Sequence, residues 1–411
     1  MSQMRAVYLD NNATTPMRPE ALEAMLPYLK DSFGNPSSAH QFGRPIKARI
    51  AEAREIIAAG IGAKPQEIYF TGGGTEADNL AIKGCAWANK SDDRRRLVTS
   101  SIEHPAALEA VRYLVKRQGF LSTVVNVDEY ALVNPADVEA ACGDDTILVT
   151  IMLANNEVGA IQPIGQIAQA AKSRGAYLHT DAVQAFCKIP INVDELGVDM
   201  LSLSSHKVNG PKGVGALYIR KGIKVDAINH GGHHERGMRA GTENVAGIIG
   251  FAKAAQLGLA EMEKSSAQYR MMRDELQKRI MEKIPFTRLN GPQERRLPNT
   301  LNMSFECVEG EALLINLDML GIALSTGSAC SSGSLEPSPV LTAMGIPAEV
   351  VHGSLRFSFG HFNTMADVDY VMAHLPRIIN TIREISPLWD IKNQRPISLE
   401  DAAKGALYAG H

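Results

Sequence analysis

Hydrophobic positions in the first two-thirds of the chain alternate between short β-rich runs and helical patterns. Ile46, Ile50, Ala53 and Ile57 recur at the spacing of one helix face, and Gly60 follows as a helix stop. Strands that alternate with helices predict a mainly parallel sheet covered on both faces. The predicted strands are 68–71, 97–101, 123–127, 147–153, 176–179, 200–204 and 215–219.

The last third of the chain has a different pattern. A helical pattern runs from about residue 244 to residue 283 and connects to a region of mixed α+β character. We therefore predict an α/β protein with two domains and a polar tail. The large α/β domain covers residues 14–257, the small α+β domain covers residues 1–13 and 258–390, and the tail covers residues 391–411.

Composition and charge exclude several classes of protein. Hydrophobic residues make up 45% and charged residues 21% of the chain, which is typical of a globular protein. A net charge of −3 provides no basic surface for nucleic acid, and we expect no membrane partner because no charge-free apolar run is long enough to span a bilayer. The 5 cysteines contain no C-x-x-C pair, so we expect no disulfide framework or structural zinc site and a cytoplasmic location.

Ligands of open α/β sheets bind beyond the carboxyl ends of the strands, so reactive residues at strand ends are candidates for one shared site. Gly72, Gly73, Gly74 and Thr75 follow the first of these strands and open a helix. Backbone N–H groups in such a turn can bind one phosphate group, although the spacing matches neither ATP nor dinucleotide motifs. An ordinary Gly-rich turn is the alternative.

Three further strand ends carry reactive side chains. Asp181 would be desolvated and would need a cationic or N–H partner; alternatively it caps a helix or forms half of a metal site with His179. Burial would make the Lys207 amine nucleophilic towards carbonyl groups, unless it is a surface lysine. Pro105 keeps His104 extended, so its ring could stack on an aromatic ligand or transfer protons, unless it is a simple turn residue.

The remaining candidates lie further along the chain. Cys330 is surrounded by very small residues, which suits a reactive thiol that must reach its target, or else a flexible linker. Arg356 lies in an apolar strand, where a substrate carboxylate would satisfy its guanidinium group. The histidine-rich run from His230 to His234 suggests a metal site, but its spacing fits no known zinc class.

Taken together, these features meet the demands of pyridoxal 5′-phosphate (PLP). A lysine reacts with the PLP aldehyde, and an acid keeps the pyridine nitrogen protonated so that the ring accepts electrons. The set comprises a phosphate cup, an acid, a lysine, a stacking ring and a carboxylate clamp, at Gly74, Thr75, Asp181, Lys207, His104 and Arg356.

The order of the motifs resembles that of the cysteine desulfurases of the NifS/IscS type, which are class-V aminotransferase-like PLP enzymes. The resemblance extends from Tyr8 to about Trp389, and the 241–244 and 386–389 runs are more similar to the NifS branch. It implies the fold of the type I PLP-dependent transferases. The motifs include Asn155-Asn156-Glu157, His179-Thr180-Asp181, Ser205-His206-Lys207, Gly241-Thr242-Glu243-Asn244 and Gly327-Ser328-Ala329-Cys330.

The resemblance also implies a role for each site residue. Lys207 forms the Schiff base with PLP, and Cys330 is the nucleophile that receives sulfur. The ring is bound by Asp181 at its nitrogen, by His104 through stacking, and by Asn155 and Gln184 near its oxygen. The phosphate is bound by Gly74, Thr75, Ser204 and His206, and by Thr242 from the partner subunit. The substrate carboxylate is held by Asn12, Asn155 and Arg356. No residue is predicted to bind a metal.

The implied reaction is the removal of sulfur from L-cysteine, which yields L-alanine and a persulfide on Cys330. The small residues around this cysteine would let the persulfide reach an acceptor. The resemblance implies a homodimer that supplies an iron–sulfur cluster scaffold, in a role connected with nitrogen fixation. The alternatives are a selenocysteine lyase, another class-V PLP enzyme, or a metal-binding protein that uses the run from His230 to His234.

Overall fold

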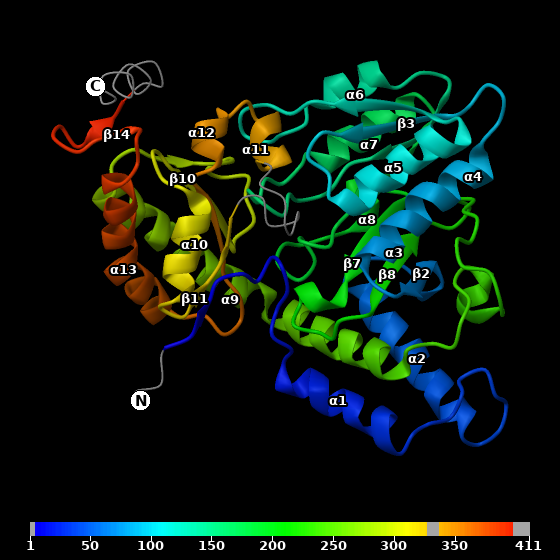
Figure 1. Cartoon of the computed structure of the whole chain (residues 1–411). Coiled ribbons are helices and arrows are strands. Elements are labelled where there is room, and N and C mark those ends of the chain that lie inside the picture. The colour runs from blue at the N-terminus through cyan, green and yellow to red at the C-terminus, as the bar shows by residue number, and fades with distance from the viewer. Residues whose placement is uncertain (1–4, 327–336, 398–411) are drawn as a thin grey trace.

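A seven-stranded sheet forms the centre of the larger half of the molecule (Figure 1). The computed structural model describes residues 5–326 and 337–397. The strand order is β2-β8-β7-β6-β5-β3-β4, and only β8 runs antiparallel to its neighbours. The sheet is therefore mainly parallel, as predicted. Its strands are β2 (Ile68–Thr71), β3 (Arg96–Ser100), β4 (Leu121–Val125), β5 (Thr146–Thr150), β6 (Tyr177–Asp181), β7 (Met200–Ser204) and β8 (Gly215–Ile219).

Helices cover both faces of this sheet. Successive strand residues point to opposite faces, so Val98 and Leu201 pack in one core while Leu97 and Met200 pack in the other. Pro105 begins α5 and Gly119, with φ 70°, ends it, as the sequence rules for helix ends require. The helices of this half are α1 (Pro19–Lys30), α2 (Gly43–Ala59), α3 (Gly74–Asn79), α4 (Cys85–Asn89), α5 (Pro105–Gln118), α6 (Pro135–Ala141), α7 (Ile164–Ser173) and α8 (Val193–Leu196).

The smaller half is built on a four-stranded antiparallel sheet of order β12-β13-β10-β9. The N-terminal strand β1 pairs in parallel with β11, so the start of the chain belongs to this half before it crosses to α1 (Figure 1). Its strands are β1 (Val7–Tyr8), β9 (Thr287–Leu289), β10 (Thr300–Phe305), β11 (Ile322–Ala323), β12 (Ser325–Thr326) and β13 (Ser354–Ser358), and its helices are α10 (Gly310–Asp318), α11 (Pro339–Ala343), α12 (Ala348–Val351) and α13 (Met365–Glu384).

The long helix α9 (Val245–Lys283) joins the two halves. Its first part supplies Phe251 and Ala255 to the core of the large sheet, and its second part supplies Met272 and Leu276 to the core of the small half. The predicted domain boundary after residue 257 falls between these two groups. Within the described residues, α9 is the single helix whose length and composition would let it cross a membrane. Its contacts with both cores account for its apolar side chains.

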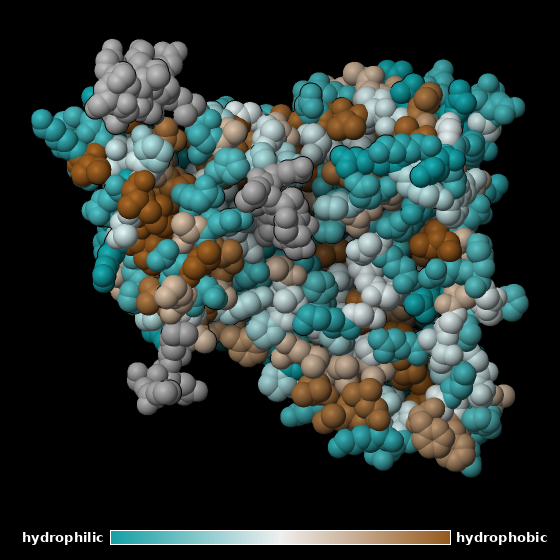
Figure 2. All heavy atoms as spheres, in the orientation of Figure 1, coloured by the Kyte–Doolittle hydropathy of each residue, from teal (hydrophilic) through white to brown (hydrophobic). Residues whose placement is uncertain are grey.

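Two regions differ from the sequence prediction. No helix was predicted at the position of α1, whose exposed face carries Leu22 and Leu29. Between α1 and α2, the rings of Phe33 and Phe42 stack at a centroid distance of 5.7 Å. Figure 2 shows apolar surface at the lower edge of the molecule, where Figure 1 places α1. The start of the predicted polar tail takes part in a small antiparallel pair of strands, β14 (Trp389–Asp390) and β15 (Arg395–Pro396).

Candidate active site

Residues from separate segments of the chain line one cavity of about 220 Å³ at the carboxyl edge of the large sheet. Strand ends, the start of α3 and the start of α5 each contribute to it, because parallel strands present their carboxyl ends on one edge. The predicted residues that line it are Gly74, Thr75, His104, Asp181, Gln184, Ser204, His206 and Lys207. Asp78, Met152, Ala154, Asn156 and Val183 complete its wall.

The phosphate cup predicted at the Gly-rich turn lies where α3 begins. A Cβ atom on Gly74 would lie 2.9 Å from Cγ2 of Val183 and 3.4 Å from Cβ of Ser204, so this approach leaves no room for a side chain. The first N–H groups of the helix have no partner within it and can bind an anion. Burial lowers the pKa of His206 to about 4, so this ring is neutral at pH 7.

The amine of Lys207 is held by the N-terminal segment. A short turn, Ser205–Lys207, follows β7 and directs the lysine into the cavity. Its Nζ donates to the carbonyl oxygens of Asn12, at 2.6 Å, and Ala13, at 2.8 Å. The same segment places Oγ1 of Thr14 3.1 Å from Nδ1 of His206. Residues 12–14 thus fix the position of the amine.

Asp181 is the last residue of β6, which extends two residues beyond its predicted end. Its Oδ1 accepts the N–H of Val183 at 2.8 Å, the contact expected of a residue that caps a turn. Burial raises the pKa of Asp181, and the nearby His104 and Lys207 partly offset this shift. A cationic ring nitrogen in the cavity would stabilise the charged carboxylate further.

His104 caps the start of α5 through its Nδ1, which accepts the N–H of Ala106 at 3.1 Å. Because Nδ1 is an acceptor there, the neutral ring carries its proton on Nε2. Burial lowers the pKa of His104, which favours this neutral form. The adjacent Glu103 is buried and accepts the N–H of Met152, and burial raises its pKa to about 8.

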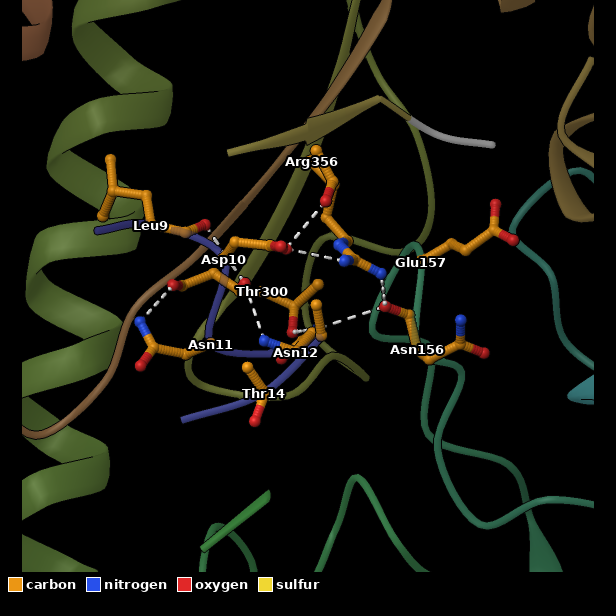
Figure 3. A network of polar contacts seen from close by, with 12 residues as sticks. Leu9, Asp10, Asn11, Asn12, Thr14, Asn156, Glu157, Thr300 and Arg356 are labelled. Atoms are coloured by element: carbon orange, nitrogen blue, oxygen red, sulfur yellow. Dashed lines mark hydrogen bonds and ion pairs between the residues drawn. The ribbon is translucent and has the colours of Figure 1, made fainter. Parts of the chain in front are cut away.

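The predicted carboxylate clamp lies in a polar network between the two halves of the molecule (Figure 3). Arg356 is 2% exposed and donates from Nη2 to Oδ1 of Asp10 at 2.8 Å and from Nη1 to the carbonyl oxygen of Asn156 at 3.0 Å. Within the described residues, its buried Nε has no hydrogen-bond partner. The guanidinium group therefore retains unused N–H capacity for a carboxylate.

Asn12 joins the same network. Its Nδ2 donates to the carbonyl oxygen of Asn156 at 3.1 Å and to Oγ1 of Thr300 at 2.9 Å (Figure 3). The side chains of Asn12 and Arg356 therefore converge on one carbonyl oxygen. A substrate carboxylate would have to replace the carbonyl oxygen of Asn156 as the acceptor for at least one of these two side chains.

Asn155 lies differently from its neighbour in the sequence. Its Oδ1 accepts the N–H groups of Glu157 and Val158, both at 2.9 Å, and its Nδ2 donates to the carbonyl oxygen of Ile102 at 3.1 Å. Asn155 is fully buried and shapes the turn, whereas Asn156 lines the cavity. The structure thus places Asn155 behind the predicted site.

Thr242 and Cys330 are the last two of the predicted site residues. Thr242 is exposed and does not line the cavity, and it is the residue predicted to act on a partner subunit. Cys330 lies in the segment 327–336, outside the described residues.

The metal-binding alternatives receive no support from the described part of the chain. His179 is fully buried and contacts hydroxyl groups of Thr150 and Ser202, both at 2.9 Å. Glu235, next to the histidine-rich run, forms a two-point ion pair with Arg54. Among residues 5–326 and 337–397, no group of three or more His, Cys, Asp or Glu side chains is arranged to hold a metal ion.

The residues that line the cavity fit PLP. The glycine cup accepts an anionic group of limited size, Asp181 can pair with a protonated ring nitrogen, and a lysine amine lies in the same cavity. His104 provides a flat neutral ring beside them. The sequence did not identify Asp10 or the carbonyl groups of Asn156 and Ala13, because their positions result from contacts between distant segments.

Residues 7–371 match the family model described as Aminotransferase class-V, so the chain belongs to this family, and the predicted family and type I fold are confirmed. It is 53% identical to the cysteine desulfurase IscS of Methanosarcina thermophila over 387 residues, which cover 94% of this chain and 95% of that protein. A solved NifS-like protein superposes with a TM-score of 0.86 at 37% identity, covering 92% of this chain and 100% of that one. The solved structure of SspA in complex with cysteine superposes with a TM-score of 0.77 at 37% identity, covering 87% of this chain and 100% of that one.

Proposed function

We propose that this chain is a PLP-dependent cysteine desulfurase. The observation that carries the proposal is the convergence of Lys207, Asp181, His104 and the glycine cup on one cavity, with the buried Arg356 close to its wall at Asn156. Relatives named cysteine desulfurase share about half of the sequence over nearly the whole chain, which supports the same activity.

When bound, PLP supplies an aldehyde that reacts with amines and a ring that accepts electrons from a substrate carbon. Lys207 would provide the amine, and Asp181 would pair with the ring nitrogen. His104 would pack against the ring, and Gln184 would donate near the ring oxygen. Gly74, Thr75, Ser204 and His206 would bind the phosphate group, and a second subunit would add Thr242.

The carboxylate of L-cysteine is held by Arg356 and Asn12. The unused Nε of Arg356 is available without breaking a contact, whereas the Nδ2 of Asn12 must leave the carbonyl oxygen of Asn156. Asn155 supports this region by holding the turn that carries Asn156. Orientation of the carboxylate places the substrate so that its α-carbon faces Lys207.

Lys207 moves the proton. Its Nζ removes the proton from the α-carbon of the substrate and later supplies a proton, while the carbonyl groups of Asn12 and Ala13 keep it in position. His104 holds a second proton on Nε2, on the ring that faces the cavity.

Cys330 receives the sulfur as a thiolate. The overall reaction converts the thiol of Cys330 and L-cysteine into a persulfide on Cys330 and L-alanine. The S–C bond of the substrate breaks and an S–S bond forms. An iron–sulfur cluster scaffold is the proposed acceptor, in a cytoplasmic and nitrogen-fixation-related role.

The proposed enzyme acts as a homodimer. The exposed apolar side chains of α1 and the stacked Phe33 and Phe42 form the kind of patch that protein interfaces cover. The exposed position of Thr242 is compatible with a role in the site of a second copy.

Mass spectrometry of the purified protein after incubation with L-cysteine tests this function. We expect one added sulfur atom on Cys330 and formation of L-alanine, and no added sulfur in Cys330→Ala. Sulfide release by Cys330→Ala at the normal rate would contradict the assignment of the nucleophile. Parallel turnover with L-selenocysteine decides between a desulfurase and a selenocysteine lyase.

A further inference from the structure

A second lysine, Lys188, is buried beside the candidate active site, and the sequence alone predicted no role for it. It follows β6 by seven residues and is only 7% exposed. Its Nζ donates to the main-chain oxygen of Gln184 at 3.0 Å and to the side-chain Oε1 of Gln184 at 3.3 Å. Both of these contacts are therefore with one residue, Gln184, which lines the PLP cavity.

Gln184 connects this lysine to Lys207. Its Nε2 donates at 2.9 Å to the carbonyl oxygen of Asn12, the same oxygen that accepts Nζ of Lys207 at 2.6 Å. The contacts thus run from Lys188 through the amide of Gln184 to the oxygen that holds the reactive amine.

In its protonated form, Lys188 selects one orientation of this amide. With Oε1 facing Lys188, Nε2 faces Asn12 and the cavity. A flipped amide would place Nε2 against the ammonium group, where two donors meet, and Oε1 against a carbonyl oxygen. Lys188 therefore makes the flipped orientation unfavourable.

No ion pair accounts for the burial of Lys188. Its side chain reaches a small cavity of about 40 Å³ that Glu261 also lines, but Glu261 binds Arg18 at 2.7 and 3.1 Å. Across the described residues, no salt bridge includes Lys188. Burial lowers its pKa to about 7, with the charge of Lys207 as a smaller cause. An apolar side chain would avoid this burial cost.

We propose that Lys188 is a positioning residue that fixes the amide of Gln184 so that an N–H group faces the oxygen of the PLP ring. This inference rests on the proposed function, because that function supplies the ligand. Lys188 acts through Gln184 and need not touch the cofactor.

A double-mutant cycle tests this role with Lys188→Met, Gln184→Ala and the double variant. Each apoprotein is titrated with PLP, and the dissociation constant and the absorbance maximum of the bound form are measured. We expect Lys188→Met to weaken PLP binding by roughly five- to tenfold and to shift the absorbance maximum. In the Gln184→Ala background, the same substitution should change neither quantity. Lys172→Met, on the exposed side of α7, is the matched control.

An equal loss of affinity from Lys188→Met in both backgrounds would overturn the inference while leaving the proposed function intact. Wild-type-like binding and absorbance of Lys188→Met would also overturn it. If Lys188→Met does not fold, Lys188→Gln enters the same cycle and is read by the same criteria. Failure of the wild-type apoprotein to bind PLP would instead refute the proposed function. Thermal unfolding of the same apoproteins measures how much the contact between Lys188 and Gln184 contributes to stability in the absence of PLP.

Discussion

The two sides of the candidate site are built in different ways. The ring and phosphate side consists of residues at or just after strand ends of one sheet, such as Asp181 and Ser204. The carboxylate side joins Asp10 and Asn12 from the N-terminal segment, the turn at Asn156 and the strand that carries Arg356. The backbone positions of the first side follow from the strands of one sheet, whereas those of the second depend on contacts between distant segments.

This difference has a consequence for function. On the ring side, the strands and turns of one sheet place the residues, and residues 12–14 add contacts to Lys207 and His206, which suits a cofactor that stays in place. On the carboxylate side, Nδ2 of Asn12 already donates to Asn156 and Thr300, so an arriving substrate must exchange contacts within a preformed network. We expect variants on the first side to affect PLP and variants on the second to affect the substrate.

The largest effect should come from the ring side. Lys207→Ala removes both the amine that reacts with PLP and the base for the α-proton, so L-alanine formation should fall by more than about 10³-fold. The measurement is L-alanine released from L-cysteine, with Lys172→Ala as the surface control. Retention of a tenth of wild-type activity by Lys207→Ala would contradict the role of this lysine.

Arg356→Met tests the carboxylate side. Loss of a charge-assisted contact should raise KM for L-cysteine by roughly 10- to 100-fold, while the dissociation constant for PLP stays within about twofold. Steady-state kinetics and PLP titration measure the two quantities, with the exposed Arg174→Met as control. If the variant loses PLP affinity and keeps its KM, the division between the two sides is wrong.

The pH dependence of stability sharpens the description of the ring side. The pKa of Glu103 is raised to about 8 in the fold, above its ordinary value near 4.5, so the folded protein holds this proton more tightly than the unfolded chain. The resulting stability is present below about pH 4.5 and is lost as pH rises towards 8. In the wild type, the free energy of unfolding should therefore fall as pH rises. In Glu103→Gln this fall should be less steep, by up to about 1.4 kcal/mol per pH unit.

Denaturant titrations of the apoprotein between pH 5 and 8 measure this slope. Glu109→Gln, an exposed residue of α5, should leave it unchanged. Parallel curves for the wild type and Glu103→Gln would show that Glu103 is ionised in the folded protein throughout this range.

The smallest effect concerns the close approach at the phosphate cup. Gly74→Ala would place a methyl group 2.9 Å from Cγ2 of Val183, and we expect PLP binding to weaken by roughly three- to tenfold. Because the nearest atom belongs to the end of a side chain, Val183→Ala should restore part of this loss. Titration of the single and double variants checks this, and a double variant no better than Gly74→Ala would exclude the steric cause.

The same contrast explains what the sequence could predict. Strands β2, β7 and β8 were predicted at their observed positions because a short run of β-forming residues is a local signal. Asp181 and Lys207 could be predicted as site residues because reactive side chains at the ends of parallel strands meet at one edge. The turn role of Asn155 and the contacts of Lys188 depend on side-chain directions that spacing does not encode.

The amine at position 207 is the centre of this account, and one measurement tests it most directly. Apoprotein is incubated with PLP and treated with borohydride, and the modified residue is identified by peptide mass spectrometry. We predict a single pyridoxyl phosphate group, attached to Lys207. Attachment to another lysine such as Lys188, or no attachment at all, would contradict the account.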